Sequence, residues 1–435
     1  MNVFLMYRDR DFDAKQNLPA QEQTLTQDLE LHTLFNAMAA GDQLVFDIAR
    51  TALLCGVRDP ETIRYRQAIL KDCLKNASLV REMYQISIES VTNKQRDWLS
   101  IFRISPASIL SSTVAMLQMF VELLKKLRRI ANEHAEQFES EGFATFFAMI
   151  KKELDDNYFA TIQTHLRSLK FRDGVLLSAK LGAGNEGAHY ILRKPHDKKR
   201  HWFQRIRAKQ SSVYKFSLHP RDDHGARVLS ELQNIGINLV ANAVAQSAEH
   251  IDNFFTMLRI ELAFYIGCLN LYEQLVQLGQ PICFPQPVDS NARQHLAQGL
   301  YDVCLALTMR RSVVGNVIHA DRKDVVIITG ANQGGKSTFL RSIGVAQLMM
   351  QCGMFAPAES FCANICEGLF THYKRQEDAT MTSGKLDEEL HRMNGIVDMV
   401  TSHSLILFNE SLMLRSRFET NDRILPSGEG LGVGS

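Results

Sequence analysis

The spacing of apolar residues between positions 23 and 168 is helical. Apolar side chains recur at steps of three and four, as in Leu31, Leu34, Phe35 and Met38, and in Leu117, Phe120, Leu124 and Leu127. This spacing places them on one face of an α-helix. Asp59 and Pro60 predict a helix start, because aspartate is a good N-cap and proline fits the first helical position. We therefore expect a helical core domain over residues 1–169.

The pattern changes near Lys170. Residues 174–181 and 188–192 are short apolar runs around a glycine-rich turn, which is typical of a β-hairpin. The turn, 182–187, also matches the dinucleotide-binding string G-x-G-x-x-G, but a strand-like run follows it instead of the required helix. We therefore interpret it as a hairpin turn within a small insertion of strands and loop over residues 170–225.

Helical periodicity returns from about position 226 to 278. One apolar face is formed by Val240, Val244, Ile251, Phe255, Leu258, Leu262, Ile266 and Leu269. Such a helix could be a rigid arm or an ordinary bundle helix, and periodicity does not separate the two. Pro281, Pro285 and Pro287 then break the pattern. We assign lever-like helices to residues 226–285 and a last domain to residues 286–435.

In the last domain, helical and strand-like patterns of apolar residues alternate. We expect a helix over residues 294–309, a strand over 325–329, a helix over 338–350 and a strand over 404–408. Alternation of this kind predicts an α/β domain.

Composition limits the class of protein. A chain of 435 residues favours two to three domains, and 45% hydrophobic with 22% charged residues indicates a folded protein. The formal net charge of +1 predicts neither a nucleic-acid nor an acidic partner, so any basic surface must be local. The eight cysteines show no pairing pattern, the N-terminus is charged too early for a secretory signal, and no uncharged apolar stretch reaches the length of a membrane span. We expect a cytoplasmic protein with reduced thiols.

Residues 330–337 fit the phosphate-binding string G-x-x-x-x-G-K-[ST] between the predicted strand and helix. Its glycines let successive backbone N–H groups turn toward phosphate oxygens. Lys336 can reach the β- and γ-phosphates, and the Ser337 hydroxyl can bind Mg²⁺. The string therefore predicts a bound nucleoside triphosphate with Mg²⁺, and the family resemblance described below implies that the nucleotide is ATP. The predicted nucleotide-binding residues in this loop are Gly330, Ala331, Asn332, Gln333, Gly334, Gly335, Lys336, Ser337 and Thr338.

A second element of such a site is an acid at the end of an apolar strand. The run over residues 405–410 ends in Glu410, which can act as general base and with Lys336 forms the predicted catalytic pair. Asn409 takes the place where an aspartate normally helps to hold Mg²⁺, and an amide is a weaker ligand for a hard cation. The alternative is a buried strand that ends at the surface. Ser383 precedes an acid-rich helical turn and by itself fits a helix cap.

In this order, these segments resemble the ATPase domain of the MutS family of DNA mismatch-repair proteins. The resemblance runs through residues 328–341, 352–358, 370–372, Ser383 with Glu388, and 404–410. The doubled glycine before Lys336 and the Gly-x-Phe-x-Pro-Ala segment at 353–358 make it more specific than the phosphate-binding string alone. Upstream, residues 59–67 resemble the start of the family's helical core domain, and the long helix before position 278 is similar to its lever arms.

The resemblance implies a multidomain fold and a set of partners. The fold is a mainly α-helical core and lever region followed by an incomplete α/β P-loop domain of the ABC-like ATPase class. DNA and a second copy of the chain are the implied partners. Ser383 would be the signature serine that reaches the γ-phosphate bound by the second copy, and Asn316 would lie beside the adenine. Only 25 residues follow Glu410, so we expect a truncated or frameshifted product.

No counterpart of the family's mismatch-reading domain precedes the helical core, and we interpret residues 120–122 as helix packing. The basic run over 193–209, with Trp202 and Phe203, could follow a phosphate backbone and stack a base, or be a solvated loop.

Three functions follow from these features. The first is a MutS-like ATPase that couples nucleotide binding to a DNA-associated helical clamp. The second is a nucleotide-binding scaffold with little or no hydrolysis. The third is a P-loop enzyme with a small-molecule substrate, which no motif supports.

Overall fold

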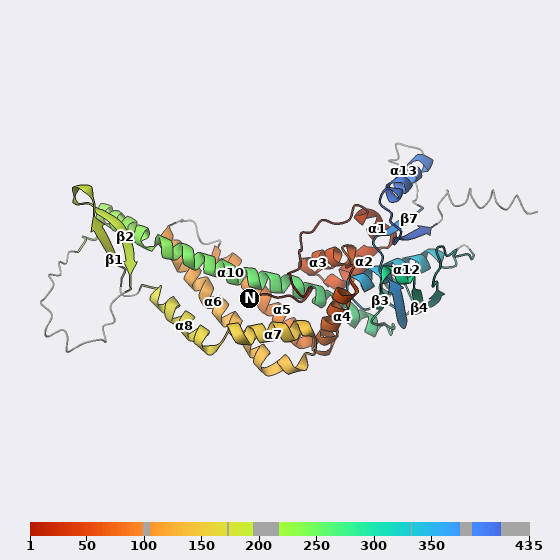
Figure 1. The fold of residues 1–435 in the computed structure, drawn as a ribbon. Helices are drawn as coiled ribbons and strands as arrows, with labels where there is room; N and C mark the ends of the chain where they lie inside the picture. The colour runs from red at the N-terminus through yellow and green to blue at the C-terminus, as the bar shows by residue number, and fades with distance from the viewer. Residues whose placement is uncertain (99–104, 172–173, 195–216, 332, 375–384, 410–435) are drawn as a thin grey trace, which may run out of the picture. The chain divides into compact units, whose positions relative to one another are not determined.

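The computed structural model describes residues 1–98, 105–171, 174–194, 217–331, 333–374 and 385–409 (Figure 1). The chain forms two compact units, each assembled from several segments. The helical unit comprises residues 1–2, 82–135 and 147–259, and the second unit comprises residues 3–81, 136–146 and 260–435. The domains predicted from the sequence are continuous ranges of residues, and their boundaries stay predictions.

The N-terminal part of the chain is helical, as its periodicity predicted. Its helices are α1 (Glu22–Asp28), α2 (Leu31–Ala39), α3 (Gln43–Leu54), α4 (Pro60–Lys75), α5 (Ala77–Trp98), α6 (Pro106–His134), α7 (Glu141–Glu153) and α8 (Asp156–Ser168), with the 3₁₀ turn Ala135–Gln137. The predicted start of α4 is confirmed, because the Asp59 carboxylate accepts the backbone N–H groups of Glu61 and Thr62 at 3.2 and 2.9 Å.

In the helical unit, α6 packs against α10 (Asp223–Gln277). The rings of Phe120 and Phe255 lie 5.6 Å apart, and both side chains are fully buried. Packing is confirmed for Phe120 and Val121, which are buried, whereas Glu122 is exposed and pairs with Lys125. Windows of α6 and α10 are long and apolar enough to cross a membrane, which is weak evidence for a membrane because core helices pass the same test.

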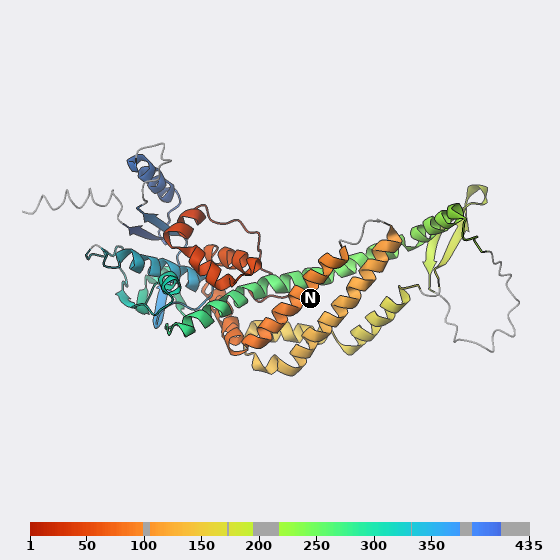
Figure 2. The same cartoon turned by 180° about the vertical axis from the view of Figure 1, so that it is seen from behind.

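The predicted hairpin is confirmed. Strands β1 (Leu176–Leu181) and β2 (Gly187–Arg193) pair antiparallel around the 3₁₀ turn Ala183–Asn185. The hairpin lies against the beginning of α10 in both views (Figures 1 and 2). A Cβ at Gly236 would lie 2.2 Å from Leu177, so the glycine permits this approach.

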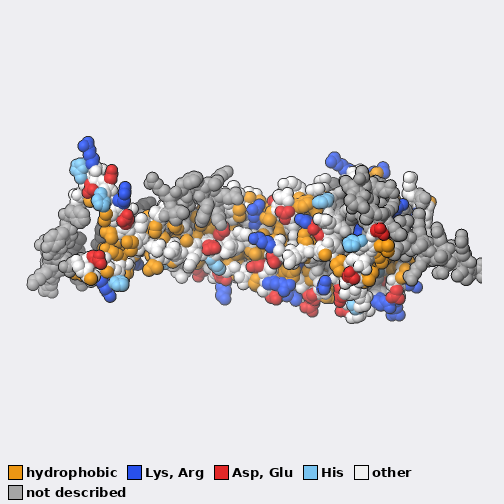
Figure 3. Space-filling view, turned by 90° about the horizontal axis from the view of Figure 1, so that it is seen from above, with side chains coloured by type: hydrophobic (Ala, Val, Ile, Leu, Met, Phe, Trp, Pro, Cys, Tyr) orange, Lys and Arg blue, Asp and Glu red, His pale blue; other side chains and the backbone are white. Residues whose placement is uncertain are grey.

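Apolar side chains are exposed over the hairpin and the beginning of α10 (Figure 3). They are Leu176, Leu181, Ile191, Val228, Leu229, Ile235 and Leu239.

In its described residues, the second unit contains two small sheets besides its helices. The four-stranded sheet has the order β3 (Gln286–Val288), β6 (Ser360–Asn364), β4 (His295–Leu300) and β5 (Asn316–His319). β3 runs parallel to β6, and β4 runs antiparallel to both of its neighbours. The second sheet pairs β7 (Leu369–Tyr373) with β8 (Leu405–Asn409) in parallel, from Leu369 opposite Leu405 to Tyr373 opposite Asn409. The remaining elements are α11 (Val303–Met309), α12 (Lys336–Gln351), α13 (Lys385–Val397) and the 3₁₀ turn Ser290–Ala292.

The helix predicted over residues 294–309 is wrong in its first half. Residues 295–300 form β4, because their backbone pairs with β6. Gly299 adopts φ 63°, and the Asp302 carboxylate then caps α11 by accepting the Leu305 N–H at 3.1 Å. Pairing with a distant segment has overridden the local helical pattern.

The strand predicted over residues 325–329 is also wrong. This segment is not a strand, and among the described residues none of its backbone groups joins a hydrogen-bonded ladder. Val325, Val326 and Ile327 are 74%, 51% and 63% exposed. A strand is stable only beside neighbours, and β7 and β8 pair with each other instead. The helix and strand predicted over 338–350 and 404–408 are confirmed as α12 and β8.

Candidate functional site

The loop before α12 folds back on itself as a tight turn. The Gly334 N–H donates to the Ala331 carbonyl at 3.1 Å, and a Cβ at Gly334 would lie 2.9 Å from that same oxygen. Gly335, the N-cap of α12, adopts φ 81°, and Gln333 adopts φ 65°. The left-handed conformation at Gly335 favours glycine, which explains why the string needs one directly before the lysine.

Lys336 lies over this loop. Its ammonium donates to the carbonyl oxygens of Gly330 and Ala331 at 2.7 and 2.9 Å. The positive charge is thus held at the N-terminal end of α12, where the helix dipole also favours an anion.

Ser337 and Asn409 lie together, as the prediction for the metal site requires. The Ser337 hydroxyl donates to Asn409 Oδ1 at 3.0 Å, although the two residues are 72 positions apart. Asn409 ends β8 and Ser337 belongs to the first turn of α12. Mg²⁺ prefers oxygen ligands, and two oxygens lie together here, but the Asn409 amide is a weaker ligand than the carboxylate that usually takes this place.

The described residues do not cover every predicted site residue. Asn332, Ser383 and Glu410 lie outside the described residues, so their roles stay predictions. Asn316 begins β5 and is exposed, and no contact among the described residues links it to the loop.

Sequence reasoning missed an ion cluster on α12. The Arg341 guanidinium pairs through Nε with Asp302 Oδ2 and through Nη1 with Glu30 Oε1. Burial raises the pKa of Asp302, while Arg341 acts in the opposite direction. Arg341 is the only charged residue of α12 after Lys336, which was the available signal, but its partners belong to other elements of the chain.

A second buried cation lies at the other end of α12. Arg66, which is 1% exposed, donates through Nη1 to the Cys352 carbonyl at 3.3 Å and through Nε to the Met6 carbonyl at 2.8 Å. A cation at a helix C-terminus is favourable, because the carbonyl ends of the peptide dipoles point toward it. Arg66 therefore ties α12 to the N-terminal segment.

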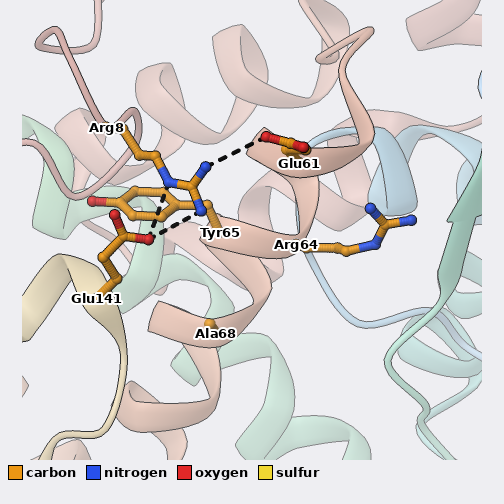
Figure 4. A pocket seen from close by; sticks show the side chains of 6 residues that line it. All are labelled: Arg8, Glu61, Arg64, Tyr65, Ala68 and Glu141. Carbon is orange, nitrogen blue, oxygen red and sulfur yellow. Dashed lines mark hydrogen bonds and ion pairs between the residues drawn. The ribbon is translucent and has the colours of Figure 1, made fainter.

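A surface pocket of about 460 Å³ lies between α4, α7 and the N-terminal segment (Figure 4). Arg8 occupies it, pairing with Glu141 at 3.0 Å and Glu61 at 3.5 Å and lying over the Tyr65 ring. The two arginines and two glutamates that line the pocket compensate one another in charge. We therefore interpret the pocket as an ion cluster that holds the N-terminal segment.

Comparison with known families gives two matches. The MutS2 N-terminal domain matches residues 58–278, and MutS domain V matches residues 326–412. Because the first match alone covers more than half of the chain, the chain belongs to the MutS family.

Individual relatives agree with this assignment. The chain is similar to MutS protein homolog 4 of Mus musculus, with 27% identity over 189 residues that cover 42% of this chain and 18% of that protein. It is 26% identical to the DNA mismatch repair protein MutS of Chlamydia muridarum over 186 residues, which are 42% of this chain and 22% of that protein. It is 38% identical to the MutS protein of Trichormus variabilis over 87 residues, or 20% and 10% of the two chains. The matched regions thus span about a fifth or less of these relatives, and the chain is related to DNA mismatch-repair proteins.

Proposed function

We propose that this chain binds ATP and Mg²⁺ at residues 330–338, hydrolyses the nucleotide, and acts on DNA in mismatch repair or a related process. The observation that carries the proposal is the hydrogen bond between Ser337 and Asn409, which brings the phosphate-binding loop to the end of β8. The match to MutS domain V over residues 326–412 supports the same assignment.

Each residue has a role in this proposal. The backbone N–H groups of the loop and the beginning of α12 hold the phosphates, and Lys336 neutralises part of their charge. Ser337 and Asn409 hold Mg²⁺, which when bound neutralises charge on the phosphate oxygens. Glu410, directly after Asn409, activates the attacking water as general base. Ser383 acts across a homodimer interface, as the family resemblance implies.

DNA as a partner is proposed on two grounds. Relatives are named DNA mismatch repair proteins, and residues 193–209 hold eight lysines or arginines against one acid, Asp197. Such a basic run binds phosphate backbones with strong salt dependence. Most of it lies outside the described residues. We also propose a cytoplasmic location, on the sequence grounds given above.

Calorimetric titration with ATP and Mg²⁺ tests the nucleotide site. Lys336→Ala removes the charge held over the loop, and we expect it to weaken binding roughly 100-fold and to abolish turnover. The matched control is Lys323→Ala, which removes an exposed lysine outside the loop and should leave the affinity unchanged.

Equal ATP affinity in Lys336→Ala and the wild type would show that the loop is not the nucleotide site. Turnover in the wild type that disappears in Lys336→Ala would argue against the scaffold function, in which ATP is bound but not hydrolysed.

A further inference from the structure

Arg341 carries a buried charge close to the phosphate-binding loop. It lies five residues after Lys336 on α12, and its side chain is only 12% exposed. Its guanidinium binds two carboxylates at once, those of Asp302 and Glu30. A planar guanidinium held by two carboxylates has a fixed orientation, which an ammonium on a flexible stem would not have.

Asp302 makes this arrangement rigid. One of its oxygens accepts the Leu305 N–H and caps α11, and the other binds Arg341. The Asp302 side chain is 1% exposed, so moving Arg341 away would leave an uncompensated buried charge. The first turns of α12 are therefore attached to the start of α11.

Glu30 attaches the same part of α12 to the connection between α1 and α2. Glu30 adopts φ 53° in this connection. Its neighbour Leu29 contacts α12 as well, because a Cβ at Gly344 would lie 2.9 Å from Leu29 and 2.8 Å from Leu407 of β8. The side of α12 that bears Gly344 is thus in contact with both the α1–α2 connection and the strand that ends in Asn409.

We propose that Arg341 is a positioning residue of the nucleotide site. Arg341 fixes the first turns of α12 against α11 and the α1–α2 connection. In this way it holds Lys336 and Ser337 at the positions from which Ser337 reaches Asn409. This inference rests on the proposed function, because it assigns Arg341 a role in binding ATP with Mg²⁺ at that site.

Calorimetry with ATP, in the presence of Mg²⁺ and again in EDTA, tests the role of Arg341. We expect Arg341→Met to weaken binding with Mg²⁺ roughly tenfold, since small displacements of aligned groups carry large penalties. The ratio of the dissociation constants in EDTA and in Mg²⁺ should fall as well, because the Ser337–Asn409 pair is displaced. Arg341→Lys keeps the charge but not the two-pronged geometry, and should recover only part of the affinity.

Arg50→Met is the matched control. It removes the ion pair between Arg50 of α3 and Glu22 of α1, at 2.5 Å, which does not involve α12. Both variants should have a lower melting temperature than the wild type. Only Arg341→Met should change the magnesium ratio, which is the dissociation constant for ATP in EDTA divided by that in Mg²⁺. If the magnesium ratio changes equally in Arg341→Met and Arg50→Met, Arg341 stabilises the fold without positioning the site.

Glu30→Gln keeps the inference testable if Arg341→Met does not fold. Glu30 is 51% exposed and its replacement leaves the Arg341–Asp302 pair intact. We expect roughly threefold weaker binding with Mg²⁺, since one of the two carboxylate contacts is lost. Wild-type affinity and magnesium ratio in folded Arg341→Met or Glu30→Gln would overturn the inference. If Lys336→Ala loses ATP binding in the same experiment, the proposed nucleotide site is supported even though the role of Arg341 is not.

Discussion

Glu261 is a buried carboxyl group that anchors the N-terminal segment to α10. It accepts the backbone N–H groups of Leu5, Met6 and Phe12 at 2.5, 3.2 and 2.8 Å, and it is fully buried. Burial raises the pKa of Glu261 to about 7, although the three N–H donors act in the opposite direction. The desolvation penalty for the charged form is thus larger than the gain from the hydrogen bonds.

This raised pKa predicts how stability depends on pH. Between the ordinary value of 4.5 and about 7, folded Glu261 keeps a proton that the unfolded chain has released. The free energy of unfolding should therefore decrease as the pH rises through this window, by about 3 kcal/mol in all. Urea unfolding of the wild type and Glu261→Gln at pH 4.5 and pH 8 measures the effect. The free energy of unfolding of the wild type minus that of Glu261→Gln should be about 3 kcal/mol lower at pH 8 than at pH 4.5, and a difference that does not change with pH would contradict the assignment.

Whether a residue could be predicted from the sequence depends on whether its signal lies in one short segment or in contacts between distant segments. Lys336, Ser337 and Asn409 were predictable because each belongs to a short contiguous motif. The partners of Arg341 and Glu261 were not, because they belong to other segments of the chain, 39 residues away for Asp302 and 256 for Leu5.

Among the elements, α12 ends in a glycine cap that its sequence requires. Gly353 adopts φ 86°, its N–H donates to the Met350 carbonyl at 3.0 Å, and the Met354 N–H donates to the Met349 carbonyl at 2.9 Å. This pair of bonds is the Schellman arrangement, which uses a left-handed residue after the helix. A Cβ at Gly353 would lie 2.5 Å from Arg66 Cβ, so packing also demands glycine here.

Gly353→Ala should therefore destabilise the protein. We expect a loss of about 2–4 kcal/mol, from left-handed strain and the collision with Arg66. The control is Gly395→Ala in α13, where a Cβ meets nothing within 4 Å and the glycine has no positive φ. It should gain about 0.5 kcal/mol from helix propensity. Thermal unfolding of both variants gives the comparison, and two changes of the same sign would refute the cap interpretation.

The elements also show which secondary structure sequence can predict. The helix α4 was predicted from its cap residues Asp59 and Pro60, α10 from its apolar periodicity, and α12 from its place after the glycine-rich loop, and all three signals are local. Strand β4 and the unpaired segment over 325–329 were mispredicted because a strand depends on its neighbours in the sheet. β8 was predicted correctly since its apolar run also pairs with β7.

For the whole molecule, the chain crosses between the two units at five places. Three crossings lie within α5, α7 and α10, between residues 81 and 82, 146 and 147, and 259 and 260. The other two lie between residues 2 and 3 and, in the 3₁₀ turn, between residues 135 and 136. The sequence suggested an arm helix after position 226, but it could not show that α10 is divided between two compact units. Which residues share a unit depends on contacts that no local pattern encodes. A continuous helix is a physical route by which the state of the nucleotide site could reach the helical unit.

Together with the proposed binding of ATP and DNA, this route predicts a coupling between the two ligands that depends on α10. If ATP changes the dissociation constant for DNA by some factor, DNA must change that for ATP by the same factor, which is commonly about fivefold or more. Thr256→Pro, at an exposed position of α10, removes a helical hydrogen bond and kinks the helix. We expect the variant to bind ATP alone as the wild type does, with the coupling factor reduced toward one.

Thr256→Ala is the control, because alanine keeps the backbone N–H and the helix. Fluorescence anisotropy of a labelled DNA duplex at low salt, with and without ATP and Mg²⁺, measures the factor for each variant. If folded Thr256→Pro keeps the wild-type factor, the units communicate through segments other than α10, and α5 or α7 becomes the next helix to interrupt. If Thr256→Ala loses the factor as well, the hydroxyl of Thr256 matters and helix continuity does not explain the coupling.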